Sequence, residues 1–569
     1  MENKPNSSRK RTRSALRHPV SISDEDIARF FEREEEISDG SATDSDFDVS
    51  SEDEETDESS EDDSGANGDC QASSDSGKRI SPAGWQTERP VITPIAFTGN
   101  SGLKIRPHVL DPIGFFMLLA NDEFFNHIIS ETNIYAQKLQ NKSVADKSKM
   151  KPWKDLTRGE FEIFLGLLFH MGLIRINKIQ YYWRKDGLYE FPTFSKAMPR
   201  DRFMIILRCL HFGRNAPDGH PKPSDPLYKI RPLLNLIQTN MKKVYYPQKQ
   251  LSLDESMVLW RGRLYFRQYI KNKRHKYGIK LYMLTEPNGL VLNCLVYTGS
   301  KDPNVGGVGH SEKVVHSLLS DYTNVGHAVY MDNFYNSYKL SRELLGKKIY
   351  STGTLRNTRK GNPHNVVNKK LAKGEVVGQY TKEGIFICKW KDRREVLMIS
   401  SEHCGEMIEV ANRRGKISKK PSVVAEYNKF MGGIDRADQI ISYYPVERRS
   451  LRWYLKLGIH MFQILLNNSQ ILHNKFSSQH MSLQNFRESV IASLIFKNKP
   501  AEIPAPIQRK EKIHLPVQIQ SEKGSRAQRK RCRNCSTTGV RRDVATYCPM
   551  CDGEPGLCLE PCFRVFHNY

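Results

Sequence analysis

The chain has 569 residues, a formal net charge of +23 and 38% hydrophobic residues, which is enough apolar material for several packed cores and excludes a wholly disordered protein. The longest mostly apolar run, residues 163–174, is far shorter than the roughly 20 residues that cross a bilayer. The polar first residues lack the apolar region of a secretory signal. We therefore expect no membrane partner.

The charge is unevenly distributed along the chain. Residues 24–69 hold 21 Asp and Glu against two Arg, a local net charge of −19, so the remainder carries +42. This acidic stretch has too few apolar groups to repay the entropy of ordering, and residues 1–95 are predicted to form a disordered tail. A body so basic suits a polyanionic partner such as nucleic acid, with a generally solvated basic surface as the alternative.

After the tail, residues 96–250 have a helical pattern. Apolar residues recur at three- and four-residue spacings in residues 111–140 and 156–174. Thr157 is followed three residues later by Glu160, the signature of a capping box at a helix start. This stretch is predicted to be a helical domain.

Near Leu251 the pattern changes to short β-rich runs, at residues 251–260, 263–270, 278–286, 290–299 and 327–333, with a helical stretch at 311–323. Several strands, a helix and another strand fit an α/β core. Strand-like pieces between basic segments then predict a β-rich insertion at residues 359–420. Helices return at residues 424–441 and 450–476.

Four separated acids stand out in these elements. Asp254 ends a short apolar run, Asp332 follows a run with the pattern of a buried strand, and Asp435 and Asp438 share one face of a helix. Two metal ions about 3.5–4 Å apart need carboxylates that converge from different elements, and Mg²⁺ or Mn²⁺ prefers such ligands. The alternative for Asp332 is a turn formed with Asn333.

A basic and aromatic segment spans residues 260–280. Its cations can neutralise phosphates, and its aromatic faces can stack on bases, although a plain amphipathic strand pair would have the same pattern. The cations are Arg261, Arg263, Arg267, Lys271, Lys273, Arg274, Lys276 and Lys280, and the aromatic residues are Tyr265, Phe266, Tyr269 and Tyr277.

Six of the 11 cysteines lie close together near the C-terminal end, and the others are scattered, which favours metal binding over a disulfide scaffold. Paired thiolates two residues apart can hold a tetrahedral Zn²⁺, so one or two zinc ions are predicted. The ligands are Cys532, Cys535, Cys548, Cys551, Cys558, Cys562 and His567, with His514 as the candidate for an eighth. A RING-type ubiquitin-ligase module is an alternative, but the adjoining "RAQRKRCR" favours DNA.

Several blocks in order resemble the piggyBac transposases: "QLSLDESMVLWRGRLYFRQYIKNKRHKYGIKLYML", "VYMDNFYNS", "STGTLRNTRKG" and "YNKFMGGIDRADQ". The resemblance covers most of residues 100–569. It implies an RNase H-like catalytic core in which Asp254, Asp332 and Asp435 act through two magnesium ions, with Asp438 as an extra nearby acid. It also implies nicking of double-stranded DNA at transposon ends, hairpin formation, and joining to TTAA targets.

The same resemblance assigns further residues and partners. It implies target-DNA contacts for Arg356 and Arg359, a position near the active site for Trp453, and recognition of transposon ends by the zinc segment. An ordinary core position is the alternative for Trp453. A homodimer is expected, because two DNA ends are cut in concert. Basic clusters "RKRTR" and "RKRCR" together with a DNA substrate predict a nuclear protein.

The predicted fold class is therefore α/β, with an RNase H-like core, a β-rich insertion, flanking helical domains and a small zinc-binding domain. The expected plan is a tail (1–95), a helical dimerisation and DNA-binding domain (96–250 and 446–520), a catalytic core (251–358 and 421–445), an insertion (359–420) and a cysteine-rich domain (530–569). An active transposase is the first hypothesis, and a domesticated, non-catalytic DNA-binding or chromatin protein the second. The four intact acids favour the first.

Overall fold

The computed structural model describes residues 84–142, 153–216, 220–221, 223–270, 276–411, 415, 417–497, 514–520 and 528–567. The chain divides into two compact units, residues 1–497 and 498–569, and each is described by itself. The predicted tail lies outside the described residues as far as residue 83. No helix in the described ranges is both long and apolar enough to cross a membrane.

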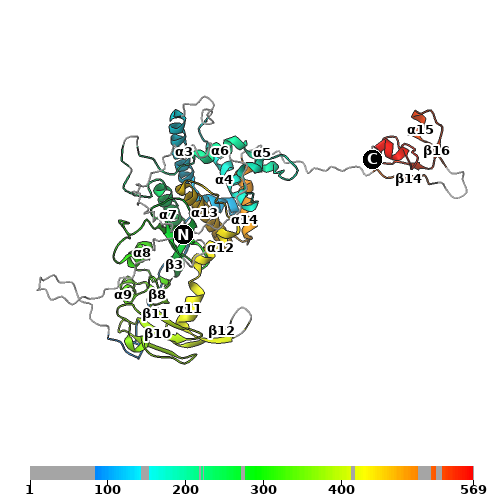
Figure 1. The fold of residues 1–569 in the computed structure, drawn as a ribbon. Helices are drawn as coiled ribbons and strands as arrows, with labels where there is room; N and C mark the ends of the chain where they lie inside the picture. The colour runs from blue at the N-terminus through cyan, green and yellow to red at the C-terminus, as the bar shows by residue number, and fades with distance from the viewer. Residues whose placement is uncertain are drawn as a thin grey trace, which may run out of the picture. The chain divides into compact units, whose positions relative to one another are not determined.

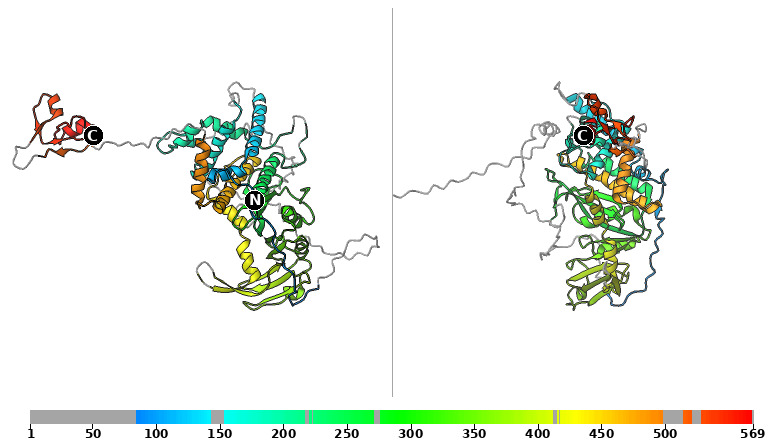
Figure 2. Two further views of the ribbon diagram at one scale, coloured as in Figure 1. Left: turned by 180° about the vertical axis from the view of Figure 1, so that it is seen from behind. Right: turned by 90° about the vertical axis from the view of Figure 1, so that its right-hand side faces the viewer.

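The larger unit contains a helical layer made from two distant parts of the sequence. Its helices are α2 (Pro112–Leu119), α3 (Asp122–Lys142), α4 (Arg158–Leu173), α5 (Pro192–Ala197), α6 (Arg200–Cys209), α7 (Arg231–Val244), α13 (Trp453–Phe476) and α14 (Leu483–Phe496). Helix α14 packs on α4 and α2, and α13 packs on α2 and α7. In Figure 1 these helices gather at one end of the unit, and Figure 2 shows the same grouping from behind.

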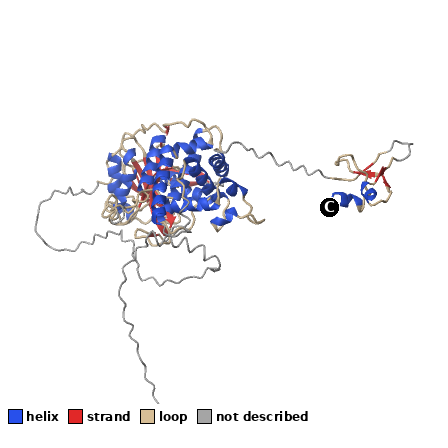
Figure 3. Ribbon diagram, turned by 90° about the horizontal axis from the view of Figure 1, so that it is seen from above, coloured by secondary structure: helices blue, strands red, loops and turns tan. Residues whose placement is uncertain are grey.

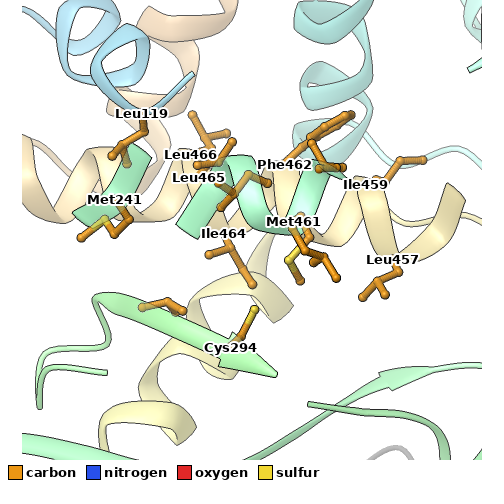
Figure 4. Packing of buried hydrophobic residues seen from close by; sticks show 14 of the residues in the cluster. Leu119, Met241, Cys294, Leu457, Ile459, Met461, Phe462, Ile464, Leu465 and Leu466 are labelled. Atoms are coloured by element: carbon orange, nitrogen blue, oxygen red, sulfur yellow. The ribbon is translucent and has the colours of Figure 1, made fainter. Parts of the chain in front are cut away.

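Helix α13 lies at the centre of this layer, and most of its side chains, apolar and polar, are buried. Ile464 and Leu465 pack in one cluster with Leu119 of α2 and Met241 of α7, and Cys294 of the sheet belongs to the same cluster (Figure 4). The helical layer and the sheet therefore share a continuous hydrophobic core. The capping interaction predicted at the start of α4 is present, since Glu160 N donates to Thr157 Oγ1 (3.3 Å).

The larger unit also contains a nine-stranded mixed sheet. Its strands are β3 (Gln250–Leu259), β4 (Gln268–Tyr269), β5 (Tyr277–Thr285), β6 (Val291–Val296), β7 (Ala328–Met331), β8 (Tyr350–Thr354), β9 (Val376–Tyr380), β10 (Phe386–Lys391) and β11 (Glu395–Ser400). Strand β3 pairs antiparallel with β5 and parallel with β7, and β7 pairs parallel with β8. The order β6-β5-β3-β7-β8 is the arrangement of an RNase H-like core. The sheet runs among the helices in Figure 3.

The predicted insertion contributes β9, β10 and β11, which extend the same sheet because β11 pairs with β8. A separate hairpin follows, formed by β12 (Met407–Ala411) and β13 (Ile417–Pro421). The helices between and after the core strands are α8 (His310–Leu318), α9 (Tyr338–Gly346), α10 (His364–Val367), α11 (Ser422–Phe430) and α12 (Gly433–Tyr443). The single helix expected at residues 424–441 is thus two helices, interrupted at Met431 and Gly432.

Residues 84–95, which the composition assigned to the tail, lie along the sheet instead. Gln86 forms a β-bridge to Tyr380 at the end of β9, and Ile95 N donates to the Tyr350 hydroxyl (2.6 Å). This corrects the predicted start of the ordered chain. The contacts join residues more than 250 positions apart in sequence, so local composition carries no signal for them.

The smaller unit is built from very short elements. They are β14 (Val517–Gln518), β15 (Lys530–Arg531), α15 (Arg533–Thr537), β16 (Asp543–Val544), β17 (Thr546–Tyr547) and α16 (Cys562–His567). Strand β14 pairs with β17, and β15 pairs with β16. Its hydrophobic cluster consists largely of cysteines around Leu557 and Phe563. So small an apolar core needs metal ligation to be stable.

Candidate active site and zinc finger

Asp254 of strand β3 and Asp332, directly after the parallel strand β7, lie side by side. The β3–β7 register pairs Leu253 with Met331, and each aspartate is the next residue along the chain. Asp254 lies in the middle of the ten-residue strand β3, so the short apolar run that it ends is only the first half of that strand. Both side chains are half-buried, so they are held by the sheet yet open to solvent.

Asp435 reaches the same region from the first turn of α12 and is exposed. The start of this helix touches the sheet so closely that a Cβ on Gly433 would lie 2.2 Å from Thr285 Oγ1 and 2.8 Å from Ser252 Oγ. Further along the helix, Ser256 Oγ donates to Asp438 Oδ1 (2.6 Å). Asp435 is therefore held between two contacts that α12 makes with β3.

The charges of all three acids act on the hydroxyl group of Tyr427 in α11. Its pKa is raised to about 12, first by burial and then by the charges of Asp332, Asp254 and Asp435, against a hydrogen bond with Thr354 that lowers it. Sequence reasoning missed Tyr427, because only the fold brings this phenol to the acids. Among the described residues, the groups whose ligand atoms all lie within 4.8 Å of one another are two Cys/His clusters, so the three carboxylates form a more open arrangement.

The turn after β7 fixes Asp332 in place. Phe334 N donates to Asp332 Oδ1 (2.9 Å), so the turn interpretation of this residue also holds for one of its oxygens. The buried Asn336 amide donates to the carbonyl oxygens of Met331, Asp332 and Thr354, at 2.9, 3.0 and 3.0 Å. One side chain thus ties the ends of β7 and β8 together beside the acid.

Gly353 leaves the space that Asn336 occupies. A Cβ at Gly353 would lie 1.8 Å from Met331 O and 2.3 Å from Asn336 Nδ2, so Gly353→Ala is expected to cost roughly 1–3 kcal/mol of stability and to displace Asp332. Thermal unfolding and strand cleavage measure the two effects. Gly346→Ala is the matched control, because nothing lies within 4 Å of its added Cβ. Equal unfolding temperatures for the two variants would contradict this role of Gly353.

The loop after β8 lies against the same turn. Arg356 Nε donates to Asn333 Oδ1 (3.3 Å), and Arg359 Nη2 donates to Phe334 O (2.5 Å). Burial, and then the charge of Arg356, lowers the pKa of the Arg359 guanidinium, while Glu312 and Asp332 oppose this shift. Both cations therefore lie beside Asp332, where a phosphate group near the acids can be reached.

The basic and aromatic segment is a short hairpin of β4 and β5. Tyr269 faces Tyr277 across it, with ring centroids 4.7 Å apart, and Arg267 lies over Tyr277. Tyr265, Tyr269 and Tyr277 are 74%, 52% and 47% exposed, whereas Phe266 is buried against Trp453.

The remaining residues predicted in this segment fall into two groups. Arg261, Arg263, Arg267 and Lys276 are exposed, and Lys280 is buried with its amine over Tyr282 and Phe334. Lys271, Lys273 and Arg274 lie outside the described residues. The Trp453 ring contacts those of Phe266 and Tyr454, so this residue anchors the hairpin to the helical layer.

The cysteines and histidines of the smaller unit gather into two sets of four. Cys532, Cys535, Cys558 and Cys562 form one set, and His514, Cys548, Cys551 and His567 form the other. The Sγ atoms of Cys535 and Cys558 are 3.7 Å apart, close to the edge of about 3.8 Å that Zn–S bonds of 2.3 Å give in a tetrahedron. His514 supplies the eighth ligand position. The two sets interleave along the chain, which is a cross-braced arrangement.

Comparison with known proteins matches the larger and the smaller unit to separate families. Residues 111–470 match the family described as Transposase IS4, and residues 509–568 match the DDE_Tnp_1-like zinc finger. The human PiggyBac transposable element-derived protein 3 is 29% identical over 396 residues, 67% of this chain and 64% of that protein. The human PiggyBac transposable element-derived protein 2 is 27% identical over 65% of this chain and 62% of its own length. The matched region thus spans less than two-thirds of either relative.

Among solved structures, a cryo-EM structure of the piggyBac transposase synaptic complex with hairpin DNA has a TM-score of 0.62 and 23% sequence identity. The similarity covers 81% of this chain and 98% of that one, and it confirms the predicted fold class. The zinc-finger match identifies the smaller unit as a zinc finger of the transposase type rather than a RING module. The family match covers more than half of the chain, which therefore belongs to the Transposase IS4 family, with piggyBac-derived proteins among its relatives.

Proposed function

We propose that this chain is a DNA transposase that excises and integrates a transposon by metal-dependent phosphoryl transfer. The observation that carries the proposal is the β3–β7 register, which sets Asp254 beside Asp332 while α12 holds Asp435 against the same strand. Three carboxylates from three elements can surround a pair of divalent ions, which a single strand cannot do.

The donor set fits two Mg²⁺ or Mn²⁺ ions. All three groups are hard oxygen ligands, the kind that these ions prefer. When bound, such ions make a water molecule or a hydroxyl group a stronger nucleophile and stabilise the departing oxygen. Asp254 and Asp332 are fixed by the sheet and would hold the ions together with Asp435 from the helix.

The proposed reaction has two kinds of transfer step. Water attacks the scissile phosphorus, the bond to the 3′-oxygen breaks, and that oxygen takes a proton to become a 3′-hydroxyl. This hydroxyl then attacks a phosphorus of the opposite strand and the bond to that strand's 3′-oxygen breaks, so a hairpin forms and the flanking DNA leaves with a 3′-hydroxyl. After water has hydrolysed the hairpin and restored the hydroxyl, the same hydroxyl attacks a phosphorus of a TTAA target and displaces a 3′-hydroxyl of the target strand. Arg356 and Arg359, beside Asp332, are suited to hold the phosphate groups during these steps.

We also propose that the β4–β5 hairpin and the zinc finger contact double-stranded DNA. The hairpin combines four exposed cations with three exposed tyrosines, and the finger carries a basic strand at Lys530–Arg531. We propose a homodimer with two active sites, because two DNA ends are cut in concert. We propose a nuclear location, because the substrate is DNA and the sequence carries basic clusters. Size measurement of the DNA complex and localisation of the tagged chain test these two points.

Arg261→Gln provides a quantitative test of the hairpin surface. Loss of one phosphate contact should reduce the slope of log K against log salt by about 0.9 and weaken binding to all duplex sequences alike. Fluorescence anisotropy over a salt series measures this slope. Lys382→Gln, at an exposed site on the β9–β10 turn, is the control. An unchanged slope for Arg261→Gln would remove this residue from the interface.

A further inference from the structure

Two serines flank Asp254 on β3. Because side chains of a strand alternate between its faces, Ser252, Asp254 and Ser256 all point to the same side of the sheet. The two serines are fully buried, with exposed fractions of 0% and 1%. A buried hydroxyl needs a hydrogen-bond partner, and each serine finds one on the segment that carries Asp435.

The partners lie on either side of Asp435. Ser252 Oγ donates to Phe430 O (2.5 Å), at the end of α11, and Ser256 Oγ donates to Asp438 Oδ1 (2.6 Å), in the second turn of α12. The strand thus holds the helix at two points, with Asp254 between the serines and Asp435 between their partners. This double attachment sets the segment that carries Asp435 alongside the part of β3 that carries Asp254.

Asp438 has a different role in this geometry from the other acids. A hydroxyl bonded to a carboxylate at 2.6 Å is a short, charge-assisted hydrogen bond. This bond holds Oδ1 of Asp438 on strand β3 and fixes the rotation of α12 about its axis. Asp435 lies three residues before Asp438, on the same face of the helix.

We propose that Ser252, Ser256 and Asp438 form a clamp that positions Asp435 opposite Asp254, and that Asp438 is a positioning residue rather than a metal ligand. The proposal rests on the proposed metal-dependent function. Groups that orient the ligands of a metal typically change its affinity or the activity 10–100-fold when they are removed. Removal of a clamp residue is expected to weaken metal binding by a factor of this size.

Binding of Mn²⁺ to the full, zinc-loaded chain tests the clamp without requiring catalysis. Electron paramagnetic resonance measures free Mn²⁺ for the parent, Ser256→Ala, Asp438→Ala and Asp438→Asn, and Asp332→Asn serves as the blank for other Mn²⁺ sites. Ser341→Ala is the matched control. Ser341 of α9 is also 1% exposed, and its hydroxyl is hydrogen-bonded to the side chain of Ser351 on β8 rather than to one of the acids. Thermal unfolding is recorded for every variant.

The clamp predicts that Ser256→Ala and Asp438→Ala weaken Mn²⁺ binding by about 10–100-fold, and that their double variant is no worse than either single one. Asp438→Asn keeps an oxygen that accepts from Ser256, so it should bind Mn²⁺ within a few-fold of the parent. If Ser256→Ala does not fold, the difference in Mn²⁺ affinity between Asp438→Asn and Asp438→Ala tests the clamp.

Equal losses in Asp438→Asn and Asp438→Ala, or parental binding by Ser256→Ala, would overturn the clamp. A parent that binds no Mn²⁺ would overturn the clamp and the proposed function together. If the parent binds Mn²⁺ and the variants follow the expected order, but the parent does not cut DNA, the clamp stands and the transposase proposal fails. If the parent cuts DNA and the variants bind like the parent, only the clamp fails.

Discussion

Asp332→Ala is expected to lower the rate of strand cleavage at least about a thousandfold, which corresponds to about 4 kcal/mol of transition-state stabilisation. The physical reason is that Asp332 and Asp254 are adjacent through the pairing of β7 with β3, so the proposed pair of ions would lose one of its carboxylate ligands. Binding of duplex DNA should change little, because the residue adds negative charge rather than a phosphate contact. Single-turnover cleavage and anisotropy measure the two properties.

Asp321→Ala is the matched control for this substitution. Asp321 is an exposed acid that forms an ion pair with Lys242 (2.6 Å), and such surface pairs contribute about 0–1 kcal/mol to stability. It should cut DNA at the parental rate. An Asp332→Ala protein that cuts as fast as Asp321→Ala would show that the acids after β7 and in β3 do not form the catalytic centre.

Removal of zinc is expected to unfold the C-terminal unit selectively. Structural zinc sites contribute about 10–16 kcal/mol of apparent folding free energy at neutral pH, and this unit has little other core. A strong chelator, or Cys551→Ala, should therefore release zinc and abolish the unit's folded signals in NMR spectra. The larger unit has its own extensive core and should unfold at its parental temperature.

Cys404→Ala is the control for the cysteine substitution, because Cys404 lies outside both clusters and contacts Ser422. Zinc content by atomic absorption should be two ions per chain in the parent and in Cys404→Ala. One ion per chain would contradict the place of His514 as an eighth ligand. If the parent holds two ions, His514→Ala should lose one of them while the set of four cysteines keeps the other.

Much of this site could be predicted from sequence because its motifs are local. The helix start at Thr157, the cysteine pairs and the acid after β7 each lie within a few residues of the signal that identifies them. The parallel pairing of β3 with β7 joins residues 78 positions apart and has no local signal. The strand-like run predicted at residues 251–260 agrees with β3, which runs through Asp254 to Leu259 although polar Asp254, Glu255 and Ser256 interrupt its apolar pattern.

Supporting residues were harder to predict than ligands. Asn336 and Gly353 matter because one side chain fills the space that a missing Cβ leaves between two strands. Ser252 and Ser256 have the appearance of ordinary strand residues until α12 is placed on them. His514 lies 18 residues before the first cysteine of the finger, so its place in the second set of ligands depends on the pairing of β14 with β17.

The most direct test of the transposase proposal is an end-cleavage assay with the purified full chain. A duplex is used that carries the terminal sequence of the element encoding this chain, flanked by TTAA, with Mg²⁺ or with a chelator. The proposal predicts nicks at the transposon end followed by hairpins with Mg²⁺, and neither product with the chelator. A parental protein that binds this duplex and takes up divalent metal, yet produces no nick, would contradict it and indicate a DNA-binding protein that has lost catalysis.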